Sequence, residues 1–325
     1  MYSCTASAPG SIMITGEHAV VHGHPAIVAA IEQRVTVNAW LIEDSVVEIQ
    51  SQIAPCARIP FADLKPTGPL RFVQGTVKRY AAELPRGVCL HIHSEIDSTL
   101  GLGSSAAVSA AVAAVMEGLC HLNIEAASLP LESMHREGLE LIQTIQGRGS
   151  GADLAASLWG GMVSYIPSSN NTSSARTPVG PATVEALPSP PELSLRYSGY
   201  KTPTSEVLAL VAKFRQADKE RYDQIYETMS TLAQESIDYA QSESWKDFAD
   251  ALNHYQALMV DLGVSDPTLD QIIATARRQP GTLAAKISGS GLGDCVLALG
   301  DVPEGFTQAD IASQGVSLLR EQADG

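Results

Sequence analysis

Basic residues are scarce in this chain. Its 325 residues include 21 lysines and arginines against 36 aspartates and glutamates, which gives a formal net charge of −15. A protein that binds DNA or RNA presents a basic face to the phosphate backbone, so we expect no nucleic-acid partner. A small phosphorylated ligand is compatible with this charge, because its site needs only a local positive potential.

The chain also lacks paired cysteines and long apolar runs. Its five cysteines are scattered without a C-x-x-C pair, which is typical of free thiols in a reducing compartment. Polar or charged residues interrupt every apolar stretch well short of a membrane span. The N-terminus shows no basic region followed by an apolar one, as a secretory signal would. We therefore expect a cytoplasmic protein with no membrane partner.

Three segments rich in small residues stand out instead: residues 8–11 with 16–18, residues 101–107, and residues 286–293. Small residues let backbone N–H groups approach an anionic ligand closely. The middle segment leads into an alanine-rich run over 106–116 that predicts a helix, and a helix N-terminus attracts anions. No lysine follows Gly103, so the segment is not the phosphate loop of P-loop NTPases.

The length of the chain predicts two domains or one large two-lobed domain. Periodicity predicts an α+β protein, with strands and the glycine-rich loop first and a helix-rich part second. We expect a first domain over residues 1–166 and a second over 192–325. Residues 167–191 are rich in Ser, Asn, Thr and Pro and predict an exposed loop or linker.

Some local predictions are specific enough to test. Ala8-Pro9-Gly10 predicts a turn within the first strand region, and the alternation over 34–42 predicts a strand that forms a hairpin with 46–50. Further strands are expected over 88–96, 162–166, 193–197, 283–287 and 295–299. Helices are expected over 72–84, 131–146, 205–216, 219–241, 245–262 and 268–279.

Taken in order, the three segments resemble the motifs of the GHMP kinase family, named for galacto-, homoserine, mevalonate and phosphomevalonate kinases. The resemblance covers nearly the whole chain. It implies a two-lobed α+β fold with the active site between the lobes. The N-terminal lobe would resemble ribosomal protein S5, with a left-handed βαβ unit, and the C-terminal lobe would be ferredoxin-like and helix-rich. The resemblance leaves a homodimer open.

The resemblance implies ATP-dependent phosphorylation of a small-molecule hydroxyl, with ATP and Mg²⁺ bound. Residues 159–161 and 253–267 favour the mevalonate branch, in which (R)-mevalonate becomes 5-phosphomevalonate for isoprenoid precursor synthesis. Gly149-Ser150-Gly151 favours a phosphomevalonate kinase as the alternative, and a sugar kinase of the same fold is a third. A nucleotide-binding regulatory protein without catalysis is the alternative of another class.

Asp153 is the predicted catalytic base. It lies in a stretch, residues 149–153, that resembles the family's P-S-G-x-D, whose aspartate takes the proton of the acceptor hydroxyl. An aspartate among small residues just before a helix can also be only a helix cap.

The resemblance assigns nucleotide and metal binding to two segments. The phosphate loop would use Gly101, Leu102, Gly103, Ser104, Ser105 and Ala106, and the third segment would add Gly289, Ser290 and Gly291. Ser105 would ligate Mg²⁺, although either serine could instead cap the helix. The family's metal-binding glutamate would fall at Ile142 here. Glu140 and Glu137 lie nearby on the same predicted helix, and we expect a shifted register to put Glu140 in its place.

The predicted substrate-binding residues are Glu17, His18, Ser150, Lys201 and Thr202, carried over from the same resemblance. The family usually has a lysine where this chain has Ser11. Either Asp153 and the metal act alone here, or another cation enters the site, with Lys201 and Arg148 as candidates. His18, His22 and His24 are close in sequence. No H-E-x-x-H motif and no acidic third ligand accompanies them, so they do not predict a zinc site.

Overall fold

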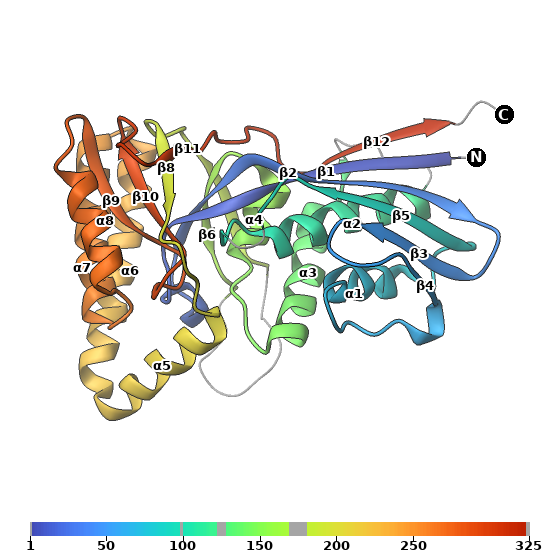
Figure 1. Ribbon diagram of the computed structural model, residues 1–325, viewed down its shortest axis with the longest axis horizontal. Helices are drawn as coiled ribbons and strands as arrows, with labels where there is room; N and C mark the ends of the chain where they lie inside the picture. Colours follow the sequence, from blue (N-terminus) through green and yellow to red (C-terminus); the bar gives the residue numbers. More distant parts are fainter. Residues whose placement is uncertain (1, 98–99, 122–127, 169–180, 323–325) are drawn as a thin grey trace.

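The computed structural model describes residues 2–97, 100–121, 128–168 and 181–322. Figure 1 shows two lobes side by side, each built on one sheet with helices against it. The first sheet has eight strands and the order β12-β1-β2-β5-β3-β4, with β6 paired to β2 and β7 paired to β6. Its strands are β1 (Tyr2–Thr15), β2 (Ala26–Ile42), β3 (Val46–Ser51), β4 (Ala57–Pro60), β5 (Gly87–Ser94), β6 (Met162–Ile166), β7 (Thr183–Leu187) and β12 (Ser317–Gln322).

The predicted hairpin of β2 with β3 is wrong. β5 lies between them, antiparallel to β2 and parallel to β3. Neighbouring strands in sequence usually pair. Here, however, β5 contributes the fully buried Val88 and Leu90. Its central position lets both of its edges form hydrogen bonds, one with β2 and the other with β3. The β3-to-β5 connection therefore crosses over through β4 and helix α1 (Arg71–Tyr80).

The predicted turn at Ala8-Pro9-Gly10 is also wrong, because β1 runs through it without a break. The register against β2 shifts between Pro9 and Gly10, so the chain kinks there as a β-bulge rather than reversing. An ideal Cβ on Gly10 would lie 2.7 Å from the backbone oxygen of Leu102. The missing side chain at residue 10 therefore lets β1 approach the glycine-rich loop.

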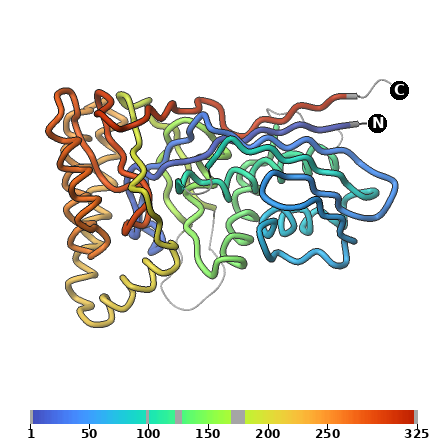
Figure 2. Tube along the Cα trace, in the orientation of Figure 1, coloured from blue at the N-terminus to red at the C-terminus, as the bar shows by residue number. Residues whose placement is uncertain are grey.

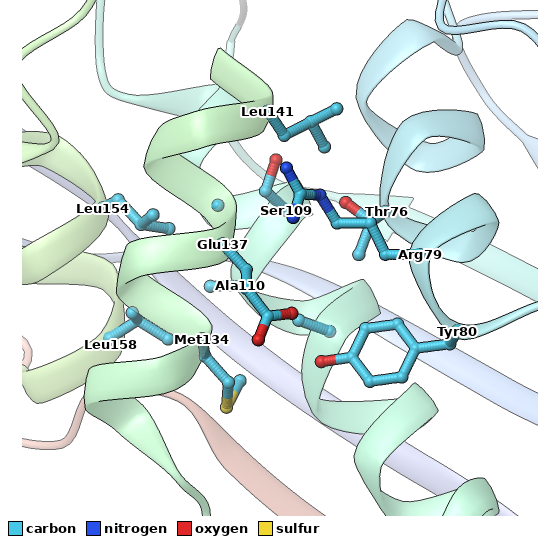
Figure 3. A pocket seen from close by; sticks show the side chains of 12 residues that line it. Thr76, Arg79, Tyr80, Ser109, Ala110, Met134, Glu137, Leu141, Leu154 and Leu158 are labelled. Atoms are coloured by element: carbon cyan, nitrogen blue, oxygen red, sulfur yellow. The ribbon is translucent and has the colours of Figure 1, made fainter. Parts of the chain in front are cut away.

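Among the described residues, α2 (Ser104–Cys120) and α4 (Ala152–Trp159) pack on the first sheet, while α1 (Arg71–Tyr80) and α3 (Leu131–Gln146) form an outer layer against these helices. α2 packs on β1 and β2 and is buried along most of its length, which its many alanines permit. Figure 3 shows the pocket between these helices, lined by side chains such as Tyr80, Leu141 and Leu154. Its volume of about 10 Å³ admits at most one water, so it cannot hold a substrate.

The second lobe has a four-stranded antiparallel sheet of order β11-β8-β10-β9. Its strands are β8 (Leu193–Tyr197), β9 (Thr282–Ser288), β10 (Cys295–Gly300) and β11 (Thr307–Gln308), and its helices are α5 (Thr204–Ala217), α6 (Lys219–Gln241), α7 (Trp245–Asp261) and α8 (Pro267–Arg277). α7 and α8 pack on β9. The side chain of Asp266 caps α8 by accepting from the backbone N–H groups of residues 268 and 269.

Two segments depart from the predicted domain plan. β7 lies inside the predicted linker and extends the first sheet through β6, while residues 169–180 of that linker are outside the described part of the chain. β12 comes after the second lobe but pairs with β1 in the first sheet. Figure 2 shows the two ends of the chain side by side at that edge. The end of the predicted second domain therefore completes the first.

All five cysteines are free thiols, as the sequence predicts. Within the described residues, no helix combines the length and apolar character that a membrane crossing requires.

Candidate active site

A cleft of about 700 Å³ lies where the two lobes meet. Its walls come from the end of β1, the turn between α3 and α4, the start of α5 and the loop after β9. Eight of the predicted site residues line it: Glu17, His18, Gly101, Ser150, Asp153, Lys201, Gly289 and Ser290. Arg148 lines it as well.

Asp153 is not a helix cap. The N-cap of α4 is Gly151, in the left-handed conformation with φ 85°, and Asp153 is the second residue of the helix. Its Oδ1 accepts a hydrogen bond of 2.8 Å from Ser11 Oγ. Burial raises the pKa of Asp153 above its usual 3.8, while the Ser11 hydrogen bond and the charge of Lys201 oppose this rise. The carboxylate is thus held ready to accept a proton inside the cleft.

The turn before Asp153 is held by two buried aromatic side chains. The Tyr165 hydroxyl donates to the backbone oxygen of Ser150 at 2.5 Å, and His135 Nε2 donates to that of Gly151 at 2.9 Å. Ser150 Oγ also accepts from the backbone N–H of Ala152 at 3.2 Å. These contacts fix where α4 begins and so where Asp153 points.

The glycine-rich loop before α2 lies directly against β1. Ser11 N donates to Leu102 O at 3.2 Å. Gly103 has φ 66°, and an ideal Cβ there would lie 2.0 Å from Ser11 Oγ. Only glycine combines this backbone conformation with this approach. Ser11 therefore connects the loop to Asp153.

The N-terminus of α2 has no side-chain cap. Its N-cap is Gly103, so neither Ser104 nor Ser105 is a capping residue. The first backbone N–H groups of a helix have no partner within it. Those of Ser104 and Ser105 are free of helical hydrogen bonds and belong to the positive end of a helix of 17 residues. This is the geometry of a phosphate-binding site.

Lys201 pairs with an acidic residue that the sequence analysis did not single out. Its Nζ lies 3.2 Å from Asp294 Oδ1, and the Asp294 side chain is only 6% exposed. Lys201 also faces Asp153, whose pKa its charge lowers. The signal for Asp294 in the sequence was an acidic residue at the end of a run of glycines, directly before Cys295.

The segment around Lys201 and the third glycine-rich segment form one unit. The Thr202 hydroxyl donates to Leu292 O at 2.6 Å, and the backbone N–H of Asp294 donates to Tyr200 O at 3.0 Å. Gly291 packs against Val264, whose oxygen would lie 2.3 Å from a Cβ at 291. Thr202 and Gly291 therefore support this wall of the cleft without lining it.

A buried ion pair joins the two lobes beneath the cleft. Glu17, which follows β1, pairs with Lys286 on β9, and both side chains are 1% exposed. Burial raises the pKa of Glu17 and lowers that of Lys286, and each partner's charge opposes the other's shift. The Tyr255 ring lies 5.5 Å from Lys286 Nζ, and its hydroxyl donates to Glu17 O at 2.9 Å.

Several buried polar atoms of residues that line the cleft have no hydrogen-bond partner, among them Glu17 Oε2, His18 Nδ1 and Ser290 Oγ. His18 Nε2 lies 2.8 Å from Ser290 O, so it carries the hydrogen and leaves Nδ1 as an acceptor. Burial lowers the pKa of His18 and keeps its ring neutral. A buried acceptor is costly without a donor, so these atoms are suited to donors on a ligand.

The structure does not bring Glu140 into the cleft. Glu140 pairs with Arg79 of α1 at 3.2 Å, whereas Ile142 lines the cleft. The helical period puts residues 140 and 142 on different faces. No group of three or more His, Cys, Asp or Glu side chains that could cage a metal occurs among the described residues. Magnesium does not need such a cage, since it is bound by one or two carboxylates together with phosphates and water.

Comparisons with known proteins identify related sequences and folds. The family model described as GHMP kinases N terminal domain matches residues 71–161, and the model described as GHMP kinases C terminal matches residues 236–314. The mevalonate kinase of Thermococcus sibiricus is 30% identical over an alignment of 326 positions, which covers 95% of this chain and 91% of that protein. The mevalonate kinase of Archaeoglobus fulgidus is 30% identical over 325 residues, covering 96% of this chain and 99% of that protein.

Solved structures share the fold at lower identity. A Lin0012 protein from Listeria innocua superposes with a TM-score of 0.84 at 21% identity, covering 98% of this chain and 99% of that one. A crystal structure of mevalonate kinase gives 0.74 at 21% identity, with 95% and 99% covered. The phosphomevalonate kinase of Streptococcus pneumoniae, in complex with phosphomevalonate and AMPPNP, gives 0.71 at 17% identity, with 91% of each chain covered. The two-lobed architecture is common to all three.

Proposed function

Because the chain belongs to the GHMP kinase family and is an ATP-dependent kinase, we propose that it phosphorylates (R)-mevalonate to give 5-phosphomevalonate and ADP. Relatives named mevalonate kinase, which match nearly the full chain, support this acceptor. The observation that carries the proposal is the pair of unpartnered acceptors in the cleft, Glu17 Oε2 and His18 Nδ1.

These two atoms favour an acceptor with free hydroxyl groups. A hydroxyl donates to a carboxylate or a neutral imidazole nitrogen, whereas a phosphate group next to Glu17 would meet a like charge. A phosphorylated acceptor would also call for additional cations. Three cationic side chains line the cleft, those of Arg71, Arg148 and Lys201, and Lys201 is already paired with Asp294.

Asp153 is the proton acceptor in this proposal. Its carboxylate holds a hydroxyl, that of Ser11, at 2.8 Å, and an acceptor hydroxyl beside it would be within the same reach. Asp153 takes the hydroxyl proton as the oxygen bonds to the transferred phosphorus. Lys201 supplies the positive charge that Ser11 cannot, because it faces both Asp153 and the glycine-rich loop.

The nucleotide would bind through its phosphates at the N-terminus of α2. Gly101, Gly103 and the free N–H groups of Ser104 and Ser105 form that surface. Ser105 is proposed to help hold Mg²⁺. When bound, that ion neutralises the phosphate charge.

An acceptor screen tests the proposal. ADP release should be fastest with (R)-mevalonate, and its kcat/KM should exceed those of phosphomevalonate and galactose by about 100-fold or more, as expected when buried polar groups are matched by one acceptor only. A preference for phosphomevalonate would contradict the proposal and favour the alternative suggested by Gly149-Ser150-Gly151. Nucleotide binding without turnover on any acceptor would indicate the regulatory alternative.

The role of Lys201 gives a separate prediction. Lys201→Ala should lower kcat/KM by about 10- to 1000-fold, the range expected when one electrostatic contact to the transition state is lost. Steady-state kinetics with ATP and the best acceptor measure this, with Lys213→Ala on the exposed face of α5 as the matched control. Wild-type kinetics in Lys201→Ala would exclude it as the cation that replaces the family lysine.

A further inference from the structure

Asp294 has an unusual backbone conformation. Its φ is 64°, in the left-handed region that favours glycine, and it is one of four non-glycine residues with positive φ in the described chain. Aspartate tolerates this region better than most residues, yet it gives up some stability there. Non-glycine residues with strained backbones are concentrated at functional sites, so this conformation points to a role for the Asp294 side chain in the cleft.

The Asp294 carboxylate lies between two glycine-rich segments. Its Oδ1 is 2.9 Å from where a Cβ on Gly101 would be, and its Oδ2 is 3.3 Å from the same position on Gly289. The side chain is 6% exposed and lines the cleft. Lys201 Nζ lies 3.2 Å from Oδ1, as an ion pair.

This carboxylate is placed where nucleotide phosphates would meet it. Gly101 begins the loop that leads to the N-terminus of α2, so phosphates bound there would face a buried negative charge a short distance away. Two like charges in a buried site repel strongly. Lys201 carries one positive charge, which Asp294 and Asp153 already share. A divalent cation between carboxylate and phosphate removes the conflict, and Mg²⁺ takes this combination of ligands.

We propose that Asp294 is the carboxylate ligand of the divalent cation that accompanies the nucleotide, in the role that Glu140 was predicted to fill. The proposal rests on the ATP-dependent activity given above but not on the identity of the acceptor. When Asp294 binds the cation, Lys201 is released from its ion pair and its charge becomes available to Asp153 and the transferred phosphate. One residue thus accounts for both departures from the family pattern, at Ser11 and at Ile142.

The test measures metal and nucleotide binding rather than turnover. AMPPNP, an ATP analogue that is not transferred, is titrated by calorimetry with EDTA and with Mg²⁺, and Mn²⁺ binding to the AMPPNP complex is followed by electron paramagnetic resonance. The variants are Asp294→Asn, which keeps the side-chain shape, and Asp294→Gly, whose backbone suits φ 64° and should fold at least as well. Glu304→Gln, an exposed carboxylate after β10, is the control for one lost negative charge.

In both Asp294 variants we expect the tightening of AMPPNP by Mg²⁺, and the Mn²⁺ affinity of the complex, to fall by about 10-fold or more relative to wild type and the control. AMPPNP binding in EDTA should be unchanged or tighter, because a negative charge near the phosphates has gone. If the metal-dependent tightening and the Mn²⁺ affinity match wild type, Asp294 serves only as the partner of Lys201 and the proposal is overturned. Loss of binding in EDTA would overturn it too, by showing that Asp294 shapes the phosphate loop. A failed acceptor screen leaves this result unaffected.

Discussion

Asp153→Asn should lower kcat by about 10²- to 10⁴-fold and leave the Kd of AMPPNP close to that of wild type. Asparagine keeps the shape of the side chain and can still accept the hydrogen bond from Ser11 Oγ, which measures 2.8 Å in the native protein. It cannot take a proton. The loss should therefore appear in the chemical step, and steady-state kinetics together with calorimetry separate that step from binding.

The pH profile offers a second measure of the same residue. A base must be ionised to act, so activity falls as the pH drops through its pKa. Burial raises the pKa of Asp153 above 3.8, so the acidic limb of kcat/KM should lie at higher pH than for an exposed aspartate, and Asp153→Asn should lack it.

Asp250→Asn, on the exposed face of α7, is the control for Asp153→Asn. Wild-type kcat in Asp153→Asn would remove Asp153 from the mechanism, and so would an unchanged acidic limb.

Lys286→Met should destabilise the protein by about 3–5 kcal/mol, because it leaves the buried Glu17 carboxylate without its counter-charge. Methionine is close to lysine in length and fills the same space beside the Tyr255 ring, so the effect reports on charge rather than on a cavity. Urea denaturation measures it as a lower midpoint. Lys246→Met on the exposed face of α7 is the matched control and should change the midpoint little.

The stability loss in Lys286→Met should depend on pH in a defined direction. Without Lys286, burial holds the pKa of Glu17 above its unfolded value with nothing to oppose it, so the folded state binds more protons than the unfolded state. The stability of the variant should therefore rise as the pH falls from neutral toward the unfolded-state pKa. A deficit that does not vary with pH, or a variant as stable as wild type, would show that the pair does not hold the lobes together by charge.

Local structure was largely readable from the sequence. The predicted bounds of 131–146, 162–166, 193–197 and 219–241 coincide with α3, β6, β8 and α6. The hydrophobic period and the residues that end an element, such as Gly147 after α3 and Pro167 after β6, are both local features of the sequence. Strand order was not readable in this way. The insertion of β5 between β2 and β3 and the return of β12 to β1 depend on contacts between distant segments, which no local period encodes.

For the site, the sequence by itself determined the family and the segments that carry the chemistry. Each glycine-rich segment needs a backbone conformation, or a close approach to a neighbouring backbone, that few residues other than glycine allow, as at Gly103. The glycines that meet this need are visible in the local sequence. Only the tertiary structure decided which side chains meet there. It joined Ser11 to Asp153 and Lys201 to Asp294, and it paired Glu140 with Arg79 of α1, away from the cleft. Those outcomes depend on how two lobes and a bulged strand pack together, because charge pairing and burial are properties of the folded neighbourhood and not of any one segment.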